Sequence, residues 1–128
     1  MSDVGEIKIL IQLFGIGVAE GTVVRHLAPL TADAILEKMP FALRGRFSFG
    51  SKKYWTLPGI GIRKGKSAKA IKDVNKNDLV YNPKTDELIV ILEDTTLSNK
   101  VNKIGTVKDH LEYFLKARNG LNTKFSRK

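Results

Sequence analysis

The sequence predicts a mainly β protein of one domain, in which many short strands form a closed or nearly closed barrel that two helices plug or flank. Three observations support this fold class. Apolar residues alternate with polar ones near the start, β-branched and aromatic residues dominate most later segments, and two stretches have helical spacing. The 128 residues, 42% of them hydrophobic, suffice to bury one core.

Two strands and a turn are expected first. Between residues 6 and 13, apolar side chains occupy every second position, which predicts a strand with one buried face. The β-branched stretch "GTVVRHL", residues 21–27, predicts a second strand. The intervening "GIGVAEG" spaces its glycines as a nucleotide-binding loop does, but such a loop leads from a strand into a helix. Because another strand follows here, Gly15, Gly17 and Gly21 are expected to form a hairpin and its bulge.

The stretch "LAPLTADAILEKMP", residues 27–40, predicts a short helix that plugs the core. Thr31 is the expected N-cap, and Asp33 would complement the helix dipole in the first turn. Leu30 and Ile35 occupy the two positions of a hydrophobic staple, and Pro40 ends the helix.

A β-hairpin is expected in "RGRFSFGSKKYWTLPG", residues 44–59, with its turn at Gly50 and Ser51. Counting outward from this turn pairs Phe47 with Tyr54 and Arg46 with Trp55. The side chains then face opposite ways: Phe47, Phe49 and Tyr54 toward the core, and Arg44, Arg46, Lys53 and Trp55 outward. A slip of one residue would reverse both faces.

A basic loop, two strands and a second helix complete the expected elements. Residues 59–78 predict the loop, and "DLVYNP" and "ELIVILE" predict strands joined by a Pro-Lys-Thr-Asp turn. The second of these strands is nearly all apolar, which suits burial on both faces. Residues 106–120 predict an amphipathic helix with an apolar stripe at Val107, Leu111, Phe114 and Leu115 and a C-cap at Gly120. The single domain spans 1–128; its ends, 1–5 and 122–128, could fray, although the tail could instead add a strand.

The net charge of +9 is concentrated in one segment. Residues 44–76 contain ten Lys or Arg and a single acid, Asp73. Such a segment is either a solvated face that maintains solubility or a surface that recruits nucleic acid or another anionic partner.

No catalytic or metal-binding constellation is recognisable in the sequence. Cysteine is absent, and the two histidines, His26 and His110, lack the partners that a zinc site needs. The adjacent acids at 86–87 and 93–94 are expected at strand ends, with diverging side chains. We therefore expect no metal and no organic cofactor. The sequence has neither an apolar run of membrane-spanning length nor a basic signal region, so a cytoplasmic location without membrane partners is expected.

Three stretches resemble a known family. "EGTVVRHLAPLTADAILEKMP", "YWTLPG", and "VNKNDLVYNP" followed by "ELIVIL" are similar to the small prokaryotic cyclophilin-like domains of unassigned function, over about Ile7 to Ile104. The resemblance implies a closed, cyclophilin-like, eight-stranded β-barrel with a short helix at each end.

The same resemblance does not imply prolyl isomerase activity. Active cyclophilins have a stretch of the type Phe-His-Arg-Ile-Ile-Pro-Gly-Phe, whose counterpart here is "KYWTLPGI", residues 53–60. Pro58 and Gly59 match, but Trp55 replaces the catalytic arginine, whose guanidinium stabilises the twisted amide. An indole has one N–H and no charge. Activity is expected to be absent unless Arg46, across the hairpin, brings a guanidinium to the same place.

The sequence thus predicts a cyclophilin-like binding protein whose ligand is a peptide or a small anionic molecule. Trp55 and Leu57 would supply apolar contact in a groove on the outer face of the hairpin sheet, and Arg46, Arg25 and His26 would supply polar anchors. Two alternatives stay open: a weak peptidyl-prolyl cis-trans isomerase, and a protein that binds single-stranded RNA or DNA through residues 44–76. The oligomeric state is not predicted.

Overall fold

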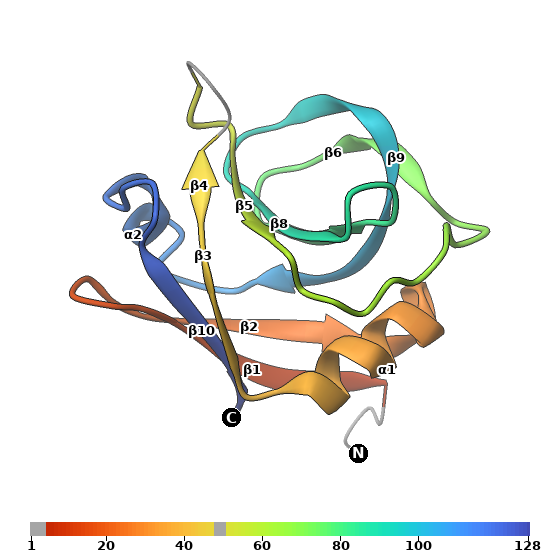
Figure 1. Cartoon of the computed structure of the whole chain (residues 1–128), viewed down its shortest axis with the longest axis horizontal. Coiled ribbons are helices and arrows are strands. Elements are labelled where there is room, and N and C mark those ends of the chain that lie inside the picture. Colours follow the sequence, from red (N-terminus) through yellow and green to blue (C-terminus); the bar gives the residue numbers. More distant parts are fainter. Residues whose placement is uncertain (1–4, 48–50) are drawn as a thin grey trace.

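The computed structural model describes residues 5–47 and 51–128, and their fold is mainly β with two α-helices (Figure 1). The strands are β1 (Glu6–Leu13), β2 (Gly17–Val24), β3 (Phe41–Arg44), β4 (Arg46–Phe47), β5 (Tyr54–Pro58), β6 (Ile71–Val74), β7 (Asp78–Asn82), β8 (Glu87–Ile91), β9 (Thr95–Val107) and β10 (Asn122–Arg127). The helices are α1 (Pro29–Lys38) and α2 (Glu112–Leu115). In the described part of the chain, neither helix has the length and apolar character needed to cross a membrane.

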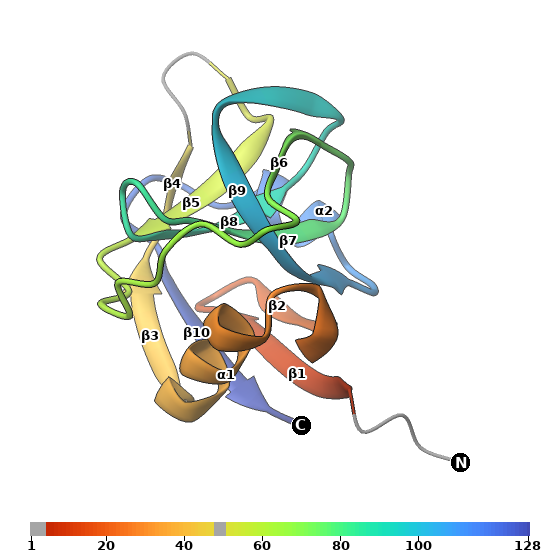
Figure 2. The same cartoon turned by 90° about the vertical axis from the view of Figure 1, so that its right-hand side faces the viewer.

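The strands form one antiparallel sheet in the order β3-β10-β1-β2-β9-β7-β8-β5-β4. Strand β9 bends, so its first half pairs with β6 while its second half pairs with β7 and β2 (Figure 2). The hydrogen-bonded order is a path with β3 at one end and β4 at the other, and Gly45 alone separates these two strands in the chain.

The amino-terminal hairpin is confirmed. Strands β1 and β2 pair along their whole lengths, and Gly15, at a φ of +81°, lies in the turn between them. Strand β2 starts earlier than expected and ends at Val24, where residues 25–27 form one turn of 3-10 helix. The tail does not fray, because β10 pairs with β1 on one side and β3 on the other.

Helix α1 is where the sequence predicts it, but its first turn differs from the expectation. The N-cap is Ala28 and Pro29 is the first helical residue, a position that proline favours, so Thr31 lies inside the helix. Thr31 is buried, and its Oγ1 accepts a hydrogen bond from Asn102. Leu30 is 77% exposed, so it forms no staple with Ile35. The helix ends at Lys38, before Pro40, as expected.

Helix α2 is much shorter than predicted. Residues 106 and 107 belong to β9, and regular helix is limited to residues 112–115. Leu111 and Phe114 are buried as expected, whereas Leu115 is 46% exposed. Gly120 lies beyond the helix, whose C-cap is Lys116. Its N–H donates a hydrogen bond to the carbonyl of Gly45 (2.7 Å), so Gly120 stabilises the turn before β10.

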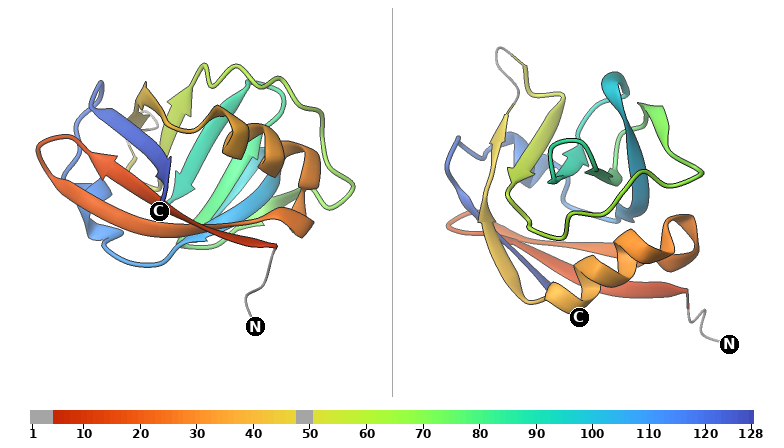
Figure 3. Two further views of the ribbon diagram at one scale, coloured as in Figure 1. Left: turned by 90° about the horizontal axis from the view of Figure 1, so that it is seen from below. Right: turned by 45° about the vertical axis from the view of Figure 1, so that its right-hand side comes forward.

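The three strands β5, β7 and β8 are covered on both faces. Their inner side chains, which include Leu57, Leu79 and Leu88, join the main core with β1, β2, β10 and α1. Their outer side chains, Val80, Ile89 and Ile91, join a smaller core with β6 and the first half of β9. The prediction that residues 87–91 are buried on both faces is therefore confirmed. Helix α1 lies between the β1–β2 hairpin and the loop that precedes β6 (Figure 3).

Candidate functional site

The pairing of β4 with β5 differs by one residue from the expected register. Arg46 lies opposite Thr56 and Phe47 opposite Trp55. Because side chains alternate along a strand, this slip reverses the face on which each residue of β5 lies. Tyr54 and Thr56 point outward, and Trp55 points into the main core. Phe49 and the predicted turn residue Gly50 lie outside the described residues.

Trp55 and Leu57 are fully buried, so the expectation that they contact a ligand in a surface groove is wrong. The indole Nε1 of Trp55 donates a hydrogen bond to Oγ1 of Thr123 at 3.2 Å, within the core. The ring of Phe47 packs edge-on against the indole, with centroids 4.8 Å apart. Trp55 thus has the environment of a core residue whose polar atom is satisfied.

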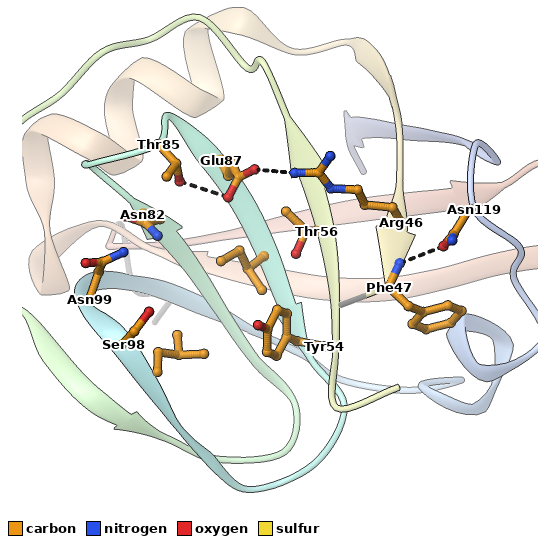
Figure 4. A pocket seen from close by; sticks show the side chains of 12 residues that line it. Arg46, Phe47, Tyr54, Thr56, Asn82, Thr85, Glu87, Ser98, Asn99 and Asn119 are labelled. Atoms are coloured by element: carbon orange, nitrogen blue, oxygen red, sulfur yellow. Dashed lines mark hydrogen bonds and ion pairs between the residues drawn. The ribbon is translucent and has the colours of Figure 1, made fainter. Parts of the chain in front are cut away.

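A cavity of about 480 Å³ opens on the outer face of β5, β7 and β8, and we call it the outer-face cavity (Figure 4). Its apolar surface comes from Tyr54, Ile89 and Leu97. The other lining residues are Arg46, Phe47, Thr56, Asn82, Thr85, Glu87, Ser98, Asn99 and Asn119. The cavity therefore combines an apolar patch with several polar side chains, as many small-ligand sites do.

An ion pair crosses the rim of the outer-face cavity (Figure 4). Nη2 of Arg46 donates to Oε2 of Glu87 at 3.2 Å, and the hydroxyl of Thr85 donates to the other carboxylate oxygen at 2.8 Å. The Glu87 side chain is only 14% exposed, whereas that of Arg46 is 58% exposed. Since this is the one hydrogen bond that the guanidinium makes within the described ranges, its other N–H groups can donate to a ligand.

Amides and hydroxyls supply further hydrogen-bonding groups to this cavity. Oδ1 of Asn82 accepts from the N–H of Lys84, and Oδ1 of Asn119 accepts from the N–H of Phe47. Each of these amides has its NH₂ group left for another acceptor. The site thus holds several donors around one cation.

The other two predicted anchors lie elsewhere. Nε and Nη2 of Arg25 donate to the two carboxylate oxygens of Asp33, at 2.7 and 3.1 Å, and this hydrogen bonding lowers the pKa of Asp33. His26 is exposed and lines a separate cavity, between the start of α1 and residues 64–69. The structure therefore does not bring Arg25, His26 and Arg46 together. The expected single groove is wrong, because Arg25 and His26 lie in the turn before α1, whereas Arg46 lies in β4 at a different cavity.

A buried polar cluster that the sequence did not reveal holds the loop before β6. The carboxylate of Asp86 accepts hydrogen bonds from the hydroxyl of Tyr81 (2.7 Å) and the N–H groups of Gly61 (2.7 Å) and Arg63 (2.9 Å). Burial alone would raise the pKa of Asp86, but these hydrogen bonds more than offset it, and the pKa lies below its usual range. Burial, together with the hydrogen bond to Asp86, raises the pKa of Tyr81 to about 12.

The adjacent acids Asp86 and Glu87 diverge as expected, one toward the loop and the other toward the outer-face cavity. Among residues 5–47 and 51–128, no group of three or more His, Cys, Asp or Glu side chains is arranged to hold a metal ion. What this arrangement can do is bind a ligand through a cation and several amide or hydroxyl groups.

No protein-family model matches the chain, and no curated protein matches its sequence. The solved structures that are similar to it include the following two. One is the solution structure of the hypothetical protein AF2241 from Archaeoglobus fulgidus, 18% identical, with a TM-score of 0.78 and 100% of both chains covered. The other is McbB in complex with tryptophan, 11% identical, with a TM-score of 0.75; the match covers 94% of this chain and 44% of McbB. Both likenesses concern the fold alone, and the resemblance to cyclophilin-like domains stays a prediction.

Proposed function

We propose that the protein is a binding domain whose site is the outer-face cavity and whose ligand is a peptide or a small anionic molecule. The observation that carries the proposal is the position of Arg46. Its exposed guanidinium, held by Glu87, lies at the rim of a cavity with an apolar patch at Tyr54, Ile89 and Leu97.

The chemistry of the cavity favours a ligand with a carboxylate and at least one amide. The guanidinium of Arg46 suits a carboxylate because its parallel N–H groups match the two oxygens. The side-chain amides of Asn82, Asn99 and Asn119 suit the alternating donors and acceptors of a peptide. Tryptophan, the molecule in the McbB complex, has a carboxylate and an apolar body and is included in the test for that reason.

The test is calorimetric titration with short peptides that end in a free carboxylate, with the same peptides amidated, and with tryptophan. The free-carboxylate peptides should bind and the amidated ones should bind more weakly. Arg46→Gln should weaken binding by about 10- to 100-fold, because a hydrogen bond to a charged group contributes about 1.5–3 kcal/mol.

Arg44→Gln is the matched control, since Arg44 is exposed, two residues away and outside the cavity lining. An equal loss of affinity in both variants would mean that the effect comes from the net charge alone, and it would contradict the proposed site. Absence of saturable binding across the whole series would contradict the function.

A second candidate function is binding of single-stranded nucleic acid, and one observation favours it. A shallow cavity of about 570 Å³ is lined by Lys66, Lys72, Lys84 and Lys100 and, within residues 5–47 and 51–128, by no acidic residue. Trp55, however, is buried and gives bases no ring to stack on. A phosphate-driven complex should lose affinity steeply as salt rises, whereas a peptide complex in the outer-face cavity should lose much less.

We also propose that the sheet closes on itself to form a barrel. If β3, Gly45 and β4 are counted as one bent strand, the strand order begins and ends with the same segment, and eight strands remain in the ring. The N–H of Gly45 donates to the carbonyl of Leu121 (2.9 Å), so the bend itself is bonded to the neighbouring turn. Slow hydrogen exchange at the Gly45 amide would support closure, and exchange as fast as in exposed turns would contradict it.

A further inference from the structure

A second cavity, of about 430 Å³, lies on a different part of the molecule from the outer-face cavity. One wall is formed by residues 26–31, at the start of α1, and the other by residues 64–69, in the loop before β6. We call it the loop–helix cavity. None of its lining residues belongs to the outer-face cavity.

The two walls differ in chemistry. Residues 27–30, "LAPL", make the helix side apolar, and Leu30, at 77%, is the most exposed large hydrophobic side chain in the described part of the chain. The loop side has three lysines, Lys64, Lys66 and Lys69, and His26 lies at the start of the helix side. Among the residues that the structure describes, no acid lines the cavity, so one side is apolar and the other is cationic.

Two acids on the elements beside this cavity, one in α1 and one bound to the loop before β6, are already engaged. Asp33 is bound by both Nε and Nη2 of Arg25, and Asp86 accepts three hydrogen bonds from the loop and Tyr81. Within the described residues, none of the cavity's three lysines forms an ion pair. The first turn of α1 has no capping side chain, which adds to the positive potential at this end.

A single buried side chain joins the two walls. Asn102, fully buried in β9, donates from Nδ2 to Oγ1 of Thr31 in α1 and to the carbonyl of Gly65, each at 3.0 Å. Its Oδ1 accepts from the N–H of Ser67 at 2.8 Å. The loop is therefore held at a set distance from the helix although it contains no regular structure, and the cavity is present before any ligand binds.

We propose that the loop–helix cavity binds a small amphipathic anion: a molecule with one carboxylate or phosphate and a short apolar body. The head would lie among the loop lysines and the body against Leu27, Pro29 and Leu30. Both halves are needed, because exposed lysines alone bind a simple anion weakly in water and Leu30 alone has no preference for charge. The volume is within the range of cavities that hold small organic ligands.

The probes are octanoate and octyl phosphate, each added below its micelle concentration to the ¹⁵N-labelled chain of 128 residues. Both should shift the amide resonances of residues 26–31 and 64–69 and saturate. Octylammonium, which has the same chain and the opposite charge, and acetate, which has the charge without the chain, should not saturate at the same concentrations. Equal binding of octylammonium, or shifts confined to other residues, would overturn the proposal.

Paired variants test both walls. The double variant Lys64→Gln/Lys69→Gln should weaken octanoate binding at least tenfold, while Lys8→Gln/Lys124→Gln, with the same change of charge on β1 and β10, should leave it unchanged. Leu30→Ser should weaken octanoate binding, whereas Leu115→Ser, at another exposed leucine, should not.

The result is separable from the function proposed above, because Arg46→Gln should leave octanoate binding intact. Vesicles of phosphatidylglycerol distinguish a membrane surface from a soluble ligand. Binding to the vesicles without saturable binding of octanoate or octyl phosphate would overturn the proposal.

Discussion

The indole of Trp55 packs so closely against Gly45 that a Cβ atom placed on this glycine would lie 2.0 Å from the ring atom Cε2. No side chain fits there, so the ring and the backbone meet only because residue 45 is glycine. Gly45 also joins β3 to β4, the strands at the two ends of the sheet order. Trp55 therefore fills the space at the joint between them.

The substitution Gly45→Ala should destabilise the protein by about 1–3 kcal/mol or more, because the methyl group must displace the indole or the backbone. Urea denaturation followed by circular dichroism measures the effect. Gly65→Ala is the control, since a Cβ at that residue meets nothing within 4 Å. A free energy of unfolding in Gly45→Ala equal to that of the control would contradict the close packing.

The hydrogen bond between Trp55 and Thr123 leads to a second prediction. Thr123→Val keeps the shape of the side chain but leaves the buried indole N–H without an acceptor, which should cost about 1–3 kcal/mol. Thermal unfolding, followed by the fluorescence of the one tryptophan, provides the measurement. Thr106→Val serves for comparison, because that side chain is only partly buried and makes no hydrogen bond in the part of the chain that the structure describes. The prediction fails if both variants melt alike.

The raised pKa of Tyr81 predicts a loss of stability in alkali. In the folded protein this pKa is about 12, against an ordinary value of 10.0. The folded state therefore retains the phenolic proton more strongly than the unfolded state does. The resulting stability, on the order of 2 kcal/mol, is fully present below pH 10 and is lost as the pH rises toward 12.

Denaturation curves of the wild type and Tyr81→Phe between pH 8 and pH 12 test this linkage. The two proteins should approach each other in stability as the pH rises, because the phenylalanine variant lacks the titrating group. Parallel pH profiles would show that the phenol has the same pKa in both states.

Asp86 predicts the opposite linkage in acid. Its pKa is lowered in the folded state, so its contribution to stability is present above its ordinary pKa and is lost as the pH falls through the folded value. Asp86→Asn is a suitable variant, because asparagine tolerates the positive φ of +56° at this position. The wild type should be the more stable protein at pH 7, and the difference should shrink below about pH 4. A difference independent of pH would contradict the assignment.

Asn102 should control the order of the loop. Asn102→Ala removes the hydrogen bonds to Gly65, Ser67 and Thr31, so local opening of residues 64–69 should become more frequent. Trypsin cleaves after lysine, and the appearance of fragments cut at Lys64, Lys66 or Lys69 measures that opening. Asn99→Ala, at a side chain without a hydrogen bond among the described residues, should leave the cleavage rate unchanged. Unchanged cleavage in Asn102→Ala would contradict the role of this residue.

Local patterns predicted much of this fold. The period of two in residues 6–13 and the glycines after it indicated the β1–β2 hairpin, and the apolar run at 87–91 indicated a strand covered on both faces. Strand β9 lacks such a pattern: it contains lysines and asparagines, and its burial depends on β2, β6 and β7, all of which precede it in the chain. The second helix was predicted to be too long because residues 106 and 107 belong to β9, whose pairing with distant strands the local pattern does not indicate.

The candidate site was harder to predict. Arg46 was identified, but Glu87, its partner, is 41 residues away, and only the pairing of β4 with β5 and of β5 with β8 brings the two together. The register of the hairpin decides whether Tyr54 or Trp55 faces the cavity. The register predicted from turn length alone was wrong by one residue. Neither the cavity nor the role of Asn102 follows from local spacing, because both depend on contacts between distant segments.

The place of β10 has a consequence for how the chain is made. This strand inserts between β1 and β3, and it pairs Phe125 with Ile11 and with Phe41. During synthesis on the ribosome, β1 and β3 are complete long before their common neighbour emerges. The edges of both strands that β10 covers therefore stay unpaired until β10 has emerged, and a nascent chain is exposed to premature association during that interval.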